Sequence, residues 1–168
     1  MTIEQAIKTA IEYEVKVKNV YAEAVKVACN DVGRRVFSVL AREKQGHVDY
    51  LHFKLDEFRK TGTVSSDDLE TALPSPKAVD AAIEKLENKM AADDRGAELE
   101  MLRKALEVEI ETSDYYLRMV NELGPEGRKF FARFVEIENG HQAIIRAEID
   151  SLNGSGFWFD MPEFDLEQ

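Results

Sequence analysis

The chain has 168 residues, of which 44% are hydrophobic, and it carries a formal net charge of -11. This length is sufficient for one domain with its own apolar core, and the single cysteine, Cys29, excludes both an internal disulfide and a paired-cysteine metal site. The excess of acidic residues repels nucleic-acid phosphates and anionic lipid, so we expect neither nucleic acid nor a membrane as a partner. No signal peptide or membrane-spanning run is evident, and we expect a reducing, cytoplasmic location.

Apolar residues at helical spacing predict an all-α chain, with two long helices in the first half. Thr2 and Gln5 form a capping-box pattern, so the first helix is expected from about residue 2 to about residue 30. A second helix is expected from about residue 31 to Gly62. One face of the first helix is apolar except for one acidic residue and one tyrosine, and it consists of Ile3, Ile7, Ala10, Glu14, Val17, Tyr21 and Val25.

A polar, proline-containing stretch from Gly62 to Pro76 is long enough for a crossover between two antiparallel helix pairs. Ser75 and Pro76 predict the start of a shorter helix over residues 77–92. The third long helix is expected from about residue 94 to residue 123.

Gly124 and Pro125 predict a break before a fourth long helix over residues 126–152, which the sequence Asn153-Gly154-Ser155-Gly156 should end. We therefore expect one bundle over residues 1–156. Residues 157–168 form an aromatic tail, which is expected to dock on the bundle or on a partner subunit.

The two halves of the chain repeat one pattern. Glu14 is followed by Tyr21, and Glu109 is followed by Tyr116 at the same spacing. Gln45-Gly46-His47 and Asn139-Gly140-His141 then follow at nearly equal distances. The sequence thus predicts a duplicated helix pair.

These acidic residues and histidines fall on apolar faces. A buried, ionised glutamate without a partner costs several kcal/mol, so Glu14 and Glu109 need a proton, an ion pair, a hydrogen bond or a metal. Glu138 and His141 are three residues apart and point to the same side of their helix. Carboxylates and imidazoles directed inward from four helices are typical of a carboxylate-bridged site for two metal ions.

This set of residues resembles the rubrerythrin branch of the ferritin-like family over nearly the whole chain, including the tail sequence Gly-Phe-Trp-Phe-Asp. The resemblance implies a ferritin-like four-helix bundle that binds two iron ions, with other divalent metals as alternatives. It implies metal ligands at Glu14, His47, Glu109, Glu138 and His141, with Tyr21 and Tyr116 as hydrogen-bond partners of the ligands. It further implies reaction with peroxide or oxygen and assembly as a homodimer.

The second helix departs from the family pattern. The family has glutamate three residues before the histidine, whereas this chain has Lys44 there and Glu43 one residue earlier. Glu43 and His47 are four residues apart and can share an ion, so Glu43 is a candidate sixth ligand. Alternatively, Lys44 points inward, pairs with Glu14 or Glu138, and leaves one metal or none.

The leading functional hypothesis is a non-haem di-iron oxidoreductase that reduces peroxide or oxygen. With one cysteine, the chain lacks the rubredoxin iron of full-length rubrerythrins, so an external electron donor is expected. The alternatives are an iron-handling protein without turnover and a metal-poor bundle that acts as an interaction module. His52 and Glu148 have no counterpart in the repeat and are left out of the expected site.

Overall fold

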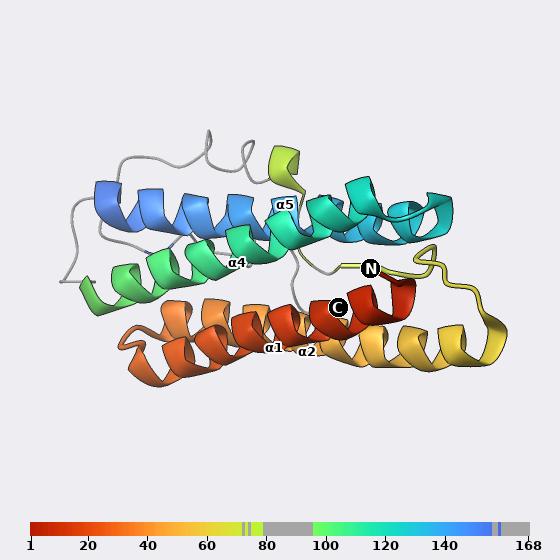
Figure 1. The fold of residues 1–168 in the computed structure, drawn as a ribbon. Coiled ribbons are helices and arrows are strands. Elements are labelled where there is room, and N and C mark those ends of the chain that lie inside the picture. The colour runs from red at the N-terminus through yellow and green to blue at the C-terminus, as the bar shows by residue number, and fades with distance from the viewer. Residues whose placement is uncertain (72, 74, 79–95, 156–157, 159–168) are drawn as a thin grey trace.

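In the computed structural model, residues 1–71, 73, 75–78, 96–155 and 158 are described, and within them the chain forms four long helices and no strand (Figure 1). The helices are α1 (Ile3–Val27), α2 (Asp31–Thr61), α4 (Gly96–Glu122) and α5 (Pro125–Ser155). None of these helices has an apolar stretch long enough to cross a bilayer. The expected all-α class and helical bundle are confirmed.

The ends of α1 and α2 follow local capping rules. Thr2 caps α1 in the expected capping box with Gln5. The helix ends at Val27, three residues earlier than expected, because the Asn30 side chain accepts hydrogen bonds from the backbone of Val32 and Gly33 and so starts α2. At the other end of α2, Gly62 adopts a left-handed conformation with φ of 75°, which glycine tolerates without strain.

In the second half of the chain, the end of α5 differs from expectation. Pro125 begins α5, as the predicted break at Gly124 and Pro125 requires. The expected stop at Asn153 and Gly154 is wrong, because α5 continues through both residues to Ser155. Glycine weakens a helix by only about 1 kcal/mol, which does not suffice to end a helix with a long packed face.

The four helices form two pairs that pack against each other (Figure 1). In one pair α1 packs along α2, in the other α4 packs along α5, and α1 also contacts α4 of the other pair. The crossover between the pairs is described only in part. Its segment up to Leu73 buries Val64, Leu69 and Leu73. Ser75 accepts a hydrogen bond from the backbone of Ala78, as a helix cap does, but most of the helix expected over 77–92 lies outside the described residues.

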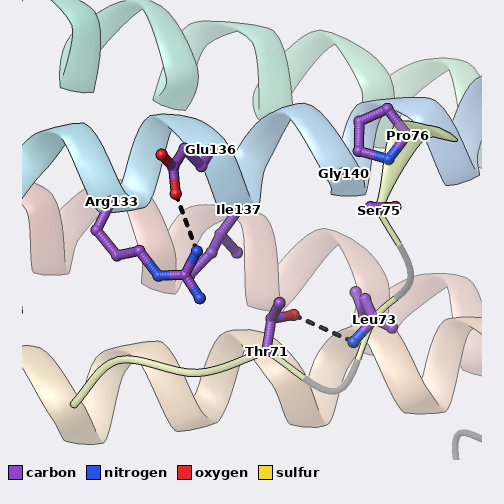
Figure 2. A pocket seen from close by; sticks show the side chains of 8 residues that line it. All are labelled: Thr71, Leu73, Ser75, Pro76, Arg133, Glu136, Ile137 and Gly140. Carbon is purple, nitrogen blue, oxygen red and sulfur yellow. Dashed lines mark hydrogen bonds and ion pairs between the residues drawn. The ribbon is translucent and has the colours of Figure 1, made fainter. Parts of the chain in front are cut away.

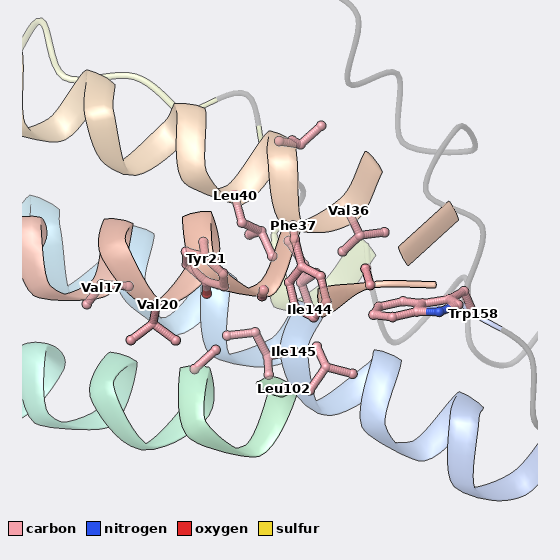
Figure 3. Packing of buried hydrophobic residues seen from close by; sticks show 14 of the residues in the cluster. Val17, Val20, Tyr21, Val36, Phe37, Leu40, Leu102, Ile144, Ile145 and Trp158 are labelled. Atoms are coloured by element: carbon pink, nitrogen blue, oxygen red, sulfur yellow. The ribbon is translucent and has the colours of Figure 1, made fainter. Parts of the chain in front are cut away.

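Buried apolar residues form two clusters along the bundle axis. One cluster includes Val17, Leu40 and Ile144 (Figure 3), and the other includes Ala10, Leu51 and Phe134. On each helix, one or more buried polar residues lie in sequence between members of the two clusters: Glu14 on α1, Lys44 and His47 on α2, Glu109 and Thr112 on α4, and Glu138 and His141 on α5. The bundle therefore has a polar layer between two apolar ones.

Trp158 from the C-terminal tail lies in the first of these clusters (Figure 3). Its ring contacts Phe37 edge to face at 5.3 Å and lies directly over Gly33, where a β-carbon would come within 2.5 Å of it. Its indole nitrogen is 3.3 Å from Glu98 of α4, which also accepts hydrogen bonds from the backbone of Cys29 and Asn30. The other aromatic residues of the tail lie outside the described part of the chain.

Candidate metal centre

The ammonium group of Lys44 is at the centre of the polar layer. It lies 2.7 Å from each carboxylate oxygen of Glu138, 2.9 Å from Glu109 and 3.3 Å from Glu14. All four side chains are fully buried. Lys44, expected as a neighbour of the ligands or as a partner of Glu14 or Glu138, thus contacts three carboxylates directly, including that of Glu109.

This arrangement sets the protonation of the cluster. Burial would lower the pKa of Lys44, but the carboxylates of Glu109, Glu138 and Glu14 outweigh burial and hold that pKa well above its usual value. Burial would likewise raise the pKa of Glu14, yet the Lys44 ammonium and then His47 hold it well below its usual value. Lys44 and Glu14 are therefore both charged at neutral pH and form an ion pair.

Glu109 behaves differently from Glu14. Burial and the adjacent charge of Glu138 raise the pKa of Glu109 to about 8, in spite of the opposing effect of Lys44. In the metal-free protein, one ammonium cannot balance several buried carboxylates, and a proton on Glu109 relieves part of the excess charge.

Two tyrosines connect the halves reciprocally. Tyr21 of α1 donates a hydrogen bond to Glu109 of α4, and Tyr116 of α4 donates one to Glu14 of α1. Burial and the adjacent carboxylates raise the pKa of both phenols well above their usual value, so both remain donors. The expected hydrogen bonds between these tyrosines and the candidate ligands are therefore present in the structure.

His47 and His141 stack on each other with ring centroids 5.4 Å apart and ring planes inclined by 18°. On one edge, Nδ1 of His47 lies 3.3 Å from Glu14, and Nδ1 of His141 lies 3.4 Å from Glu138. On the other edge, the Nε2 atoms lie 3.8 and 3.6 Å from one oxygen of Glu43. Neither Nε2 atom has a hydrogen-bond partner among the described residues.

Glu43 lies at the edge of the layer, with a side chain 13% exposed. Burial would raise its pKa, but the contact with His141 and a hydrogen bond from Thr71 lower that pKa to about 2. Thr71 belongs to the crossover and was not expected at the site, since nothing in the local sequence marks a loop threonine as a partner of Glu43.

Thr71, the hydrogen-bond partner of Glu43, lines a cavity of about 280 Å³ (Figure 2). It lies between the segment containing Thr71 and Ser75 and the face of α5 that carries Arg133 and Gly140. Gly140 directly precedes His141, and Thr71 is bonded to Glu43. The cavity is therefore next to the least buried member of the cluster.

Three groups of donor atoms are close enough to hold an ion, with all atoms of a group within 4.8 Å of one another. They are Glu43 with His47 and His141, Glu14 with His47 and Glu138, and Glu109 with Glu138 and His141. The structure thus brings together all six expected ligands.

The two residues left out of the expected site lie apart from these groups. His52 is exposed on α2. Glu148 is fully buried on α5, although it belongs to none of the three groups.

The chain matches none of the protein-family models, curated proteins or solved structures with which it was compared.

Proposed function

We propose that this protein is a non-haem metal protein of the rubrerythrin type, within the ferritin-like class, that binds iron between its helices and reduces peroxide or oxygen. The observation that supports this proposal is the polar layer itself, in which four helices direct carboxylates and two imidazoles with free Nε2 atoms toward one another. A bundle without a ligand has no need to bury such atoms unpaired, because each costs free energy.

The donor set fits iron. Carboxylate oxygen and imidazole nitrogen are the usual ligands of non-haem iron, and open coordination positions allow a small oxidant to bind. Bound iron would supply electrons for the reduction of peroxide or oxygen, and an external donor would restore them.

The chain's own residues supply the surroundings. Tyr116 and Tyr21 fix the carboxylates of Glu14 and Glu109 through hydrogen bonds. Phe134 contacts His47 edge to face and helps to keep water from the layer. Thr71, which donates a hydrogen bond to Glu43, also lines the cavity, so a small molecule in the cavity would lie one residue away from Glu43.

The residues do not fit the pair of ions that the family pattern implies. Lys44 is bonded to Glu138, the carboxylate shared by two of the three donor groups, and it also contacts Glu14 and Glu109. An ammonium in this position repels a cation bound to the same carboxylates.

Anaerobic loading with Fe(II), followed by addition of peroxide, tests the proposal. We expect bound iron to be oxidised and peroxide to be consumed, and His141→Ala to lose both while His52→Ala, an exposed histidine on α2, retains both. Protein that binds no iron, or binds iron without peroxide-dependent oxidation, contradicts the proposal.

One observation favours a second candidate. Lys44 contacts three buried carboxylates and supplies part of their counter-charge without any metal, as expected for a metal-poor bundle that serves as an interaction module. Iron handling without turnover is the third possibility. A dimer found by sedimentation would exclude storage in a cage, which needs many subunits, and would leave simple iron binding open.

A further inference from the structure

Lys44 and Glu138 occupy the same place in the two halves of the chain, three residues before His47 and His141 respectively. In a symmetric repeat both would be acidic. Here one is a cation, and the two side chains form an ion pair across the centre of the bundle with both oxygens engaged at 2.7 Å. The positive charge beside Glu138 is therefore supplied by a side chain of the protein, the Lys44 ammonium, rather than by a metal ion.

The histidines are oriented accordingly. Nδ1 of His47 lies 3.3 Å from Glu14, and Nδ1 of His141 lies 3.4 Å from Glu138 without a hydrogen bond to any described residue; Lys44 contacts both carboxylates. Histidines that bind metal almost always direct the other ring nitrogen at a carboxylate or carbonyl, which fixes the tautomer. The Nε2 atoms, which have no hydrogen-bond partner among the described residues, are then directed toward Glu43.

We propose that the chain holds one divalent cation, bound by Nε2 of His47, Nε2 of His141 and the carboxylate of Glu43, while the Lys44 ammonium permanently takes the place of a second ion. This inference rests on the proposed function, because it specifies the metal site of the same polar layer. It reverses the roles of the carboxylates: Glu14 and Glu138 orient the histidines, and Glu43, outside the family pattern, binds the ion.

The distances suit such a site. Ligand atoms about 2.1 Å from one ion are separated from each other by roughly 3.0 to 3.5 Å, depending on the coordination geometry. The Nε2 atoms of His47 and His141 are 3.8 and 3.6 Å from one oxygen of Glu43, and the three donor atoms lie within 4.8 Å of one another, so the site must contract to hold an ion. Two histidines and one carboxylate with open positions are a recurrent ligand set for Fe(II).

The charge of the layer also suits one ion. Three carboxylates, those of Glu14, Glu109 and Glu138, contact the Lys44 ammonium, and the carboxylate of Glu43 lies beside the two histidines, so the excess charge of the layer is negative. A single divalent cation beside Glu43 would offset most of this excess.

Binding of Co(II) to the full-length protein tests the inference, with metal analysis for stoichiometry and calorimetric titration for affinity. We expect one ion per chain. The matched substitutions Glu43→Gln and Glu109→Gln each neutralise one acidic residue. Glu43→Gln should weaken binding by at least about tenfold relative to Glu109→Gln, because only Glu43 contacts the ion.

A third variant, Lys44→Glu, restores the acidic residue of the repeat and should bind two ions per chain, whereas Lys54→Met, which removes another buried lysine of α2, should bind one. If Lys44→Glu does not fold, the comparison of the two glutamine variants still decides the matter. Two ions in the unmodified protein, or equal weakening by the two glutamine variants, overturn this inference and leave the proposed function standing. Absence of any bound ion overturns both.

Discussion

Both carboxylate oxygens of Glu138 lie 2.7 Å from the ammonium of Lys44, and the two residues hold equivalent positions in the repeated halves of the chain. The equivalent positions of the two halves are therefore occupied by an ion pair, Lys44 with Glu138, rather than by two acidic residues. This pair explains how a core with several glutamates is stable before any metal binds, since isolated buried charges would be costly.

Removal of the ammonium should destabilise the metal-free protein. Lys44→Met leaves three buried carboxylates without their cation, and loss of one partner of a buried pair typically costs about 3–5 kcal/mol. Urea denaturation in the presence of a chelator measures the free energy of unfolding. Lys54→Met is the control: Lys54 pairs with the more exposed Glu57 and Asp68, and such pairs contribute about 1 kcal/mol or less. Equal losses in the two variants would show that the Lys44 cluster has no special role.

The stability of the metal-free protein should fall as the pH rises from about 5 to about 8. Glu109 has a pKa of about 8 when folded and about 4.3 when unfolded, so between these values the folded chain binds the extra proton. The stabilisation from this proton is complete below the unfolded pKa and is lost as the pH rises through the folded pKa. Glu109→Gln should flatten this slope, as followed by urea denaturation at several pH values. An unchanged slope would assign the pH dependence to another group.

Gly33→Ala should displace Trp158. A β-carbon at Gly33 would lie 2.5 Å from the indole ring, so the ring must move. Because the chain has one tryptophan, its fluorescence should shift toward longer wavelength as the ring is exposed to water. Gly46→Ala is the matched control on α2, since nothing lies within 4 Å of its added carbon. Identical spectra for the two variants would contradict the docking of Trp158.

Thr71→Val should weaken metal binding. The threonine hydroxyl donates a hydrogen bond to Glu43, and loss of a partner that orients a ligand typically costs about 10–100-fold in affinity. Calorimetric titration with Co(II) measures the effect, and Thr63→Val, in the same crossover but exposed, should bind as the unmodified protein does. Unchanged affinity for Thr71→Val would remove Thr71 from the site.

The sequence predicted much of this layer because the duplication marks it. Glu14 and Glu109 each interrupt an apolar face, and helical periodicity alone brings such residues to the bundle centre. The bounds of the helices were also close, since caps such as Thr2 and Gly62 are local features.

Other features depend on tertiary packing and were not predictable in this way. Periodicity gives the direction of Lys44 but not the reach of its four-carbon chain, which here brings it to three carboxylates from three other helices. The contact of Thr71 with Glu43 depends on the path of a crossover with no regular pattern. Glu148 was left out of the expected site because it has no counterpart in the repeat, yet its side chain is fully buried.

Anomalous diffraction at the iron edge, from crystals grown anaerobically with Fe(II), would distinguish one ion beside Glu43 from a pair of ions at the centre of the bundle. We expect one peak per chain, about 2.1 Å from the Nε2 atoms of His47 and His141, with Lys44 still bonded to Glu138. Two peaks about 3.5–4 Å apart among Glu14, Glu109 and Glu138, with Lys44 displaced, would contradict this expectation.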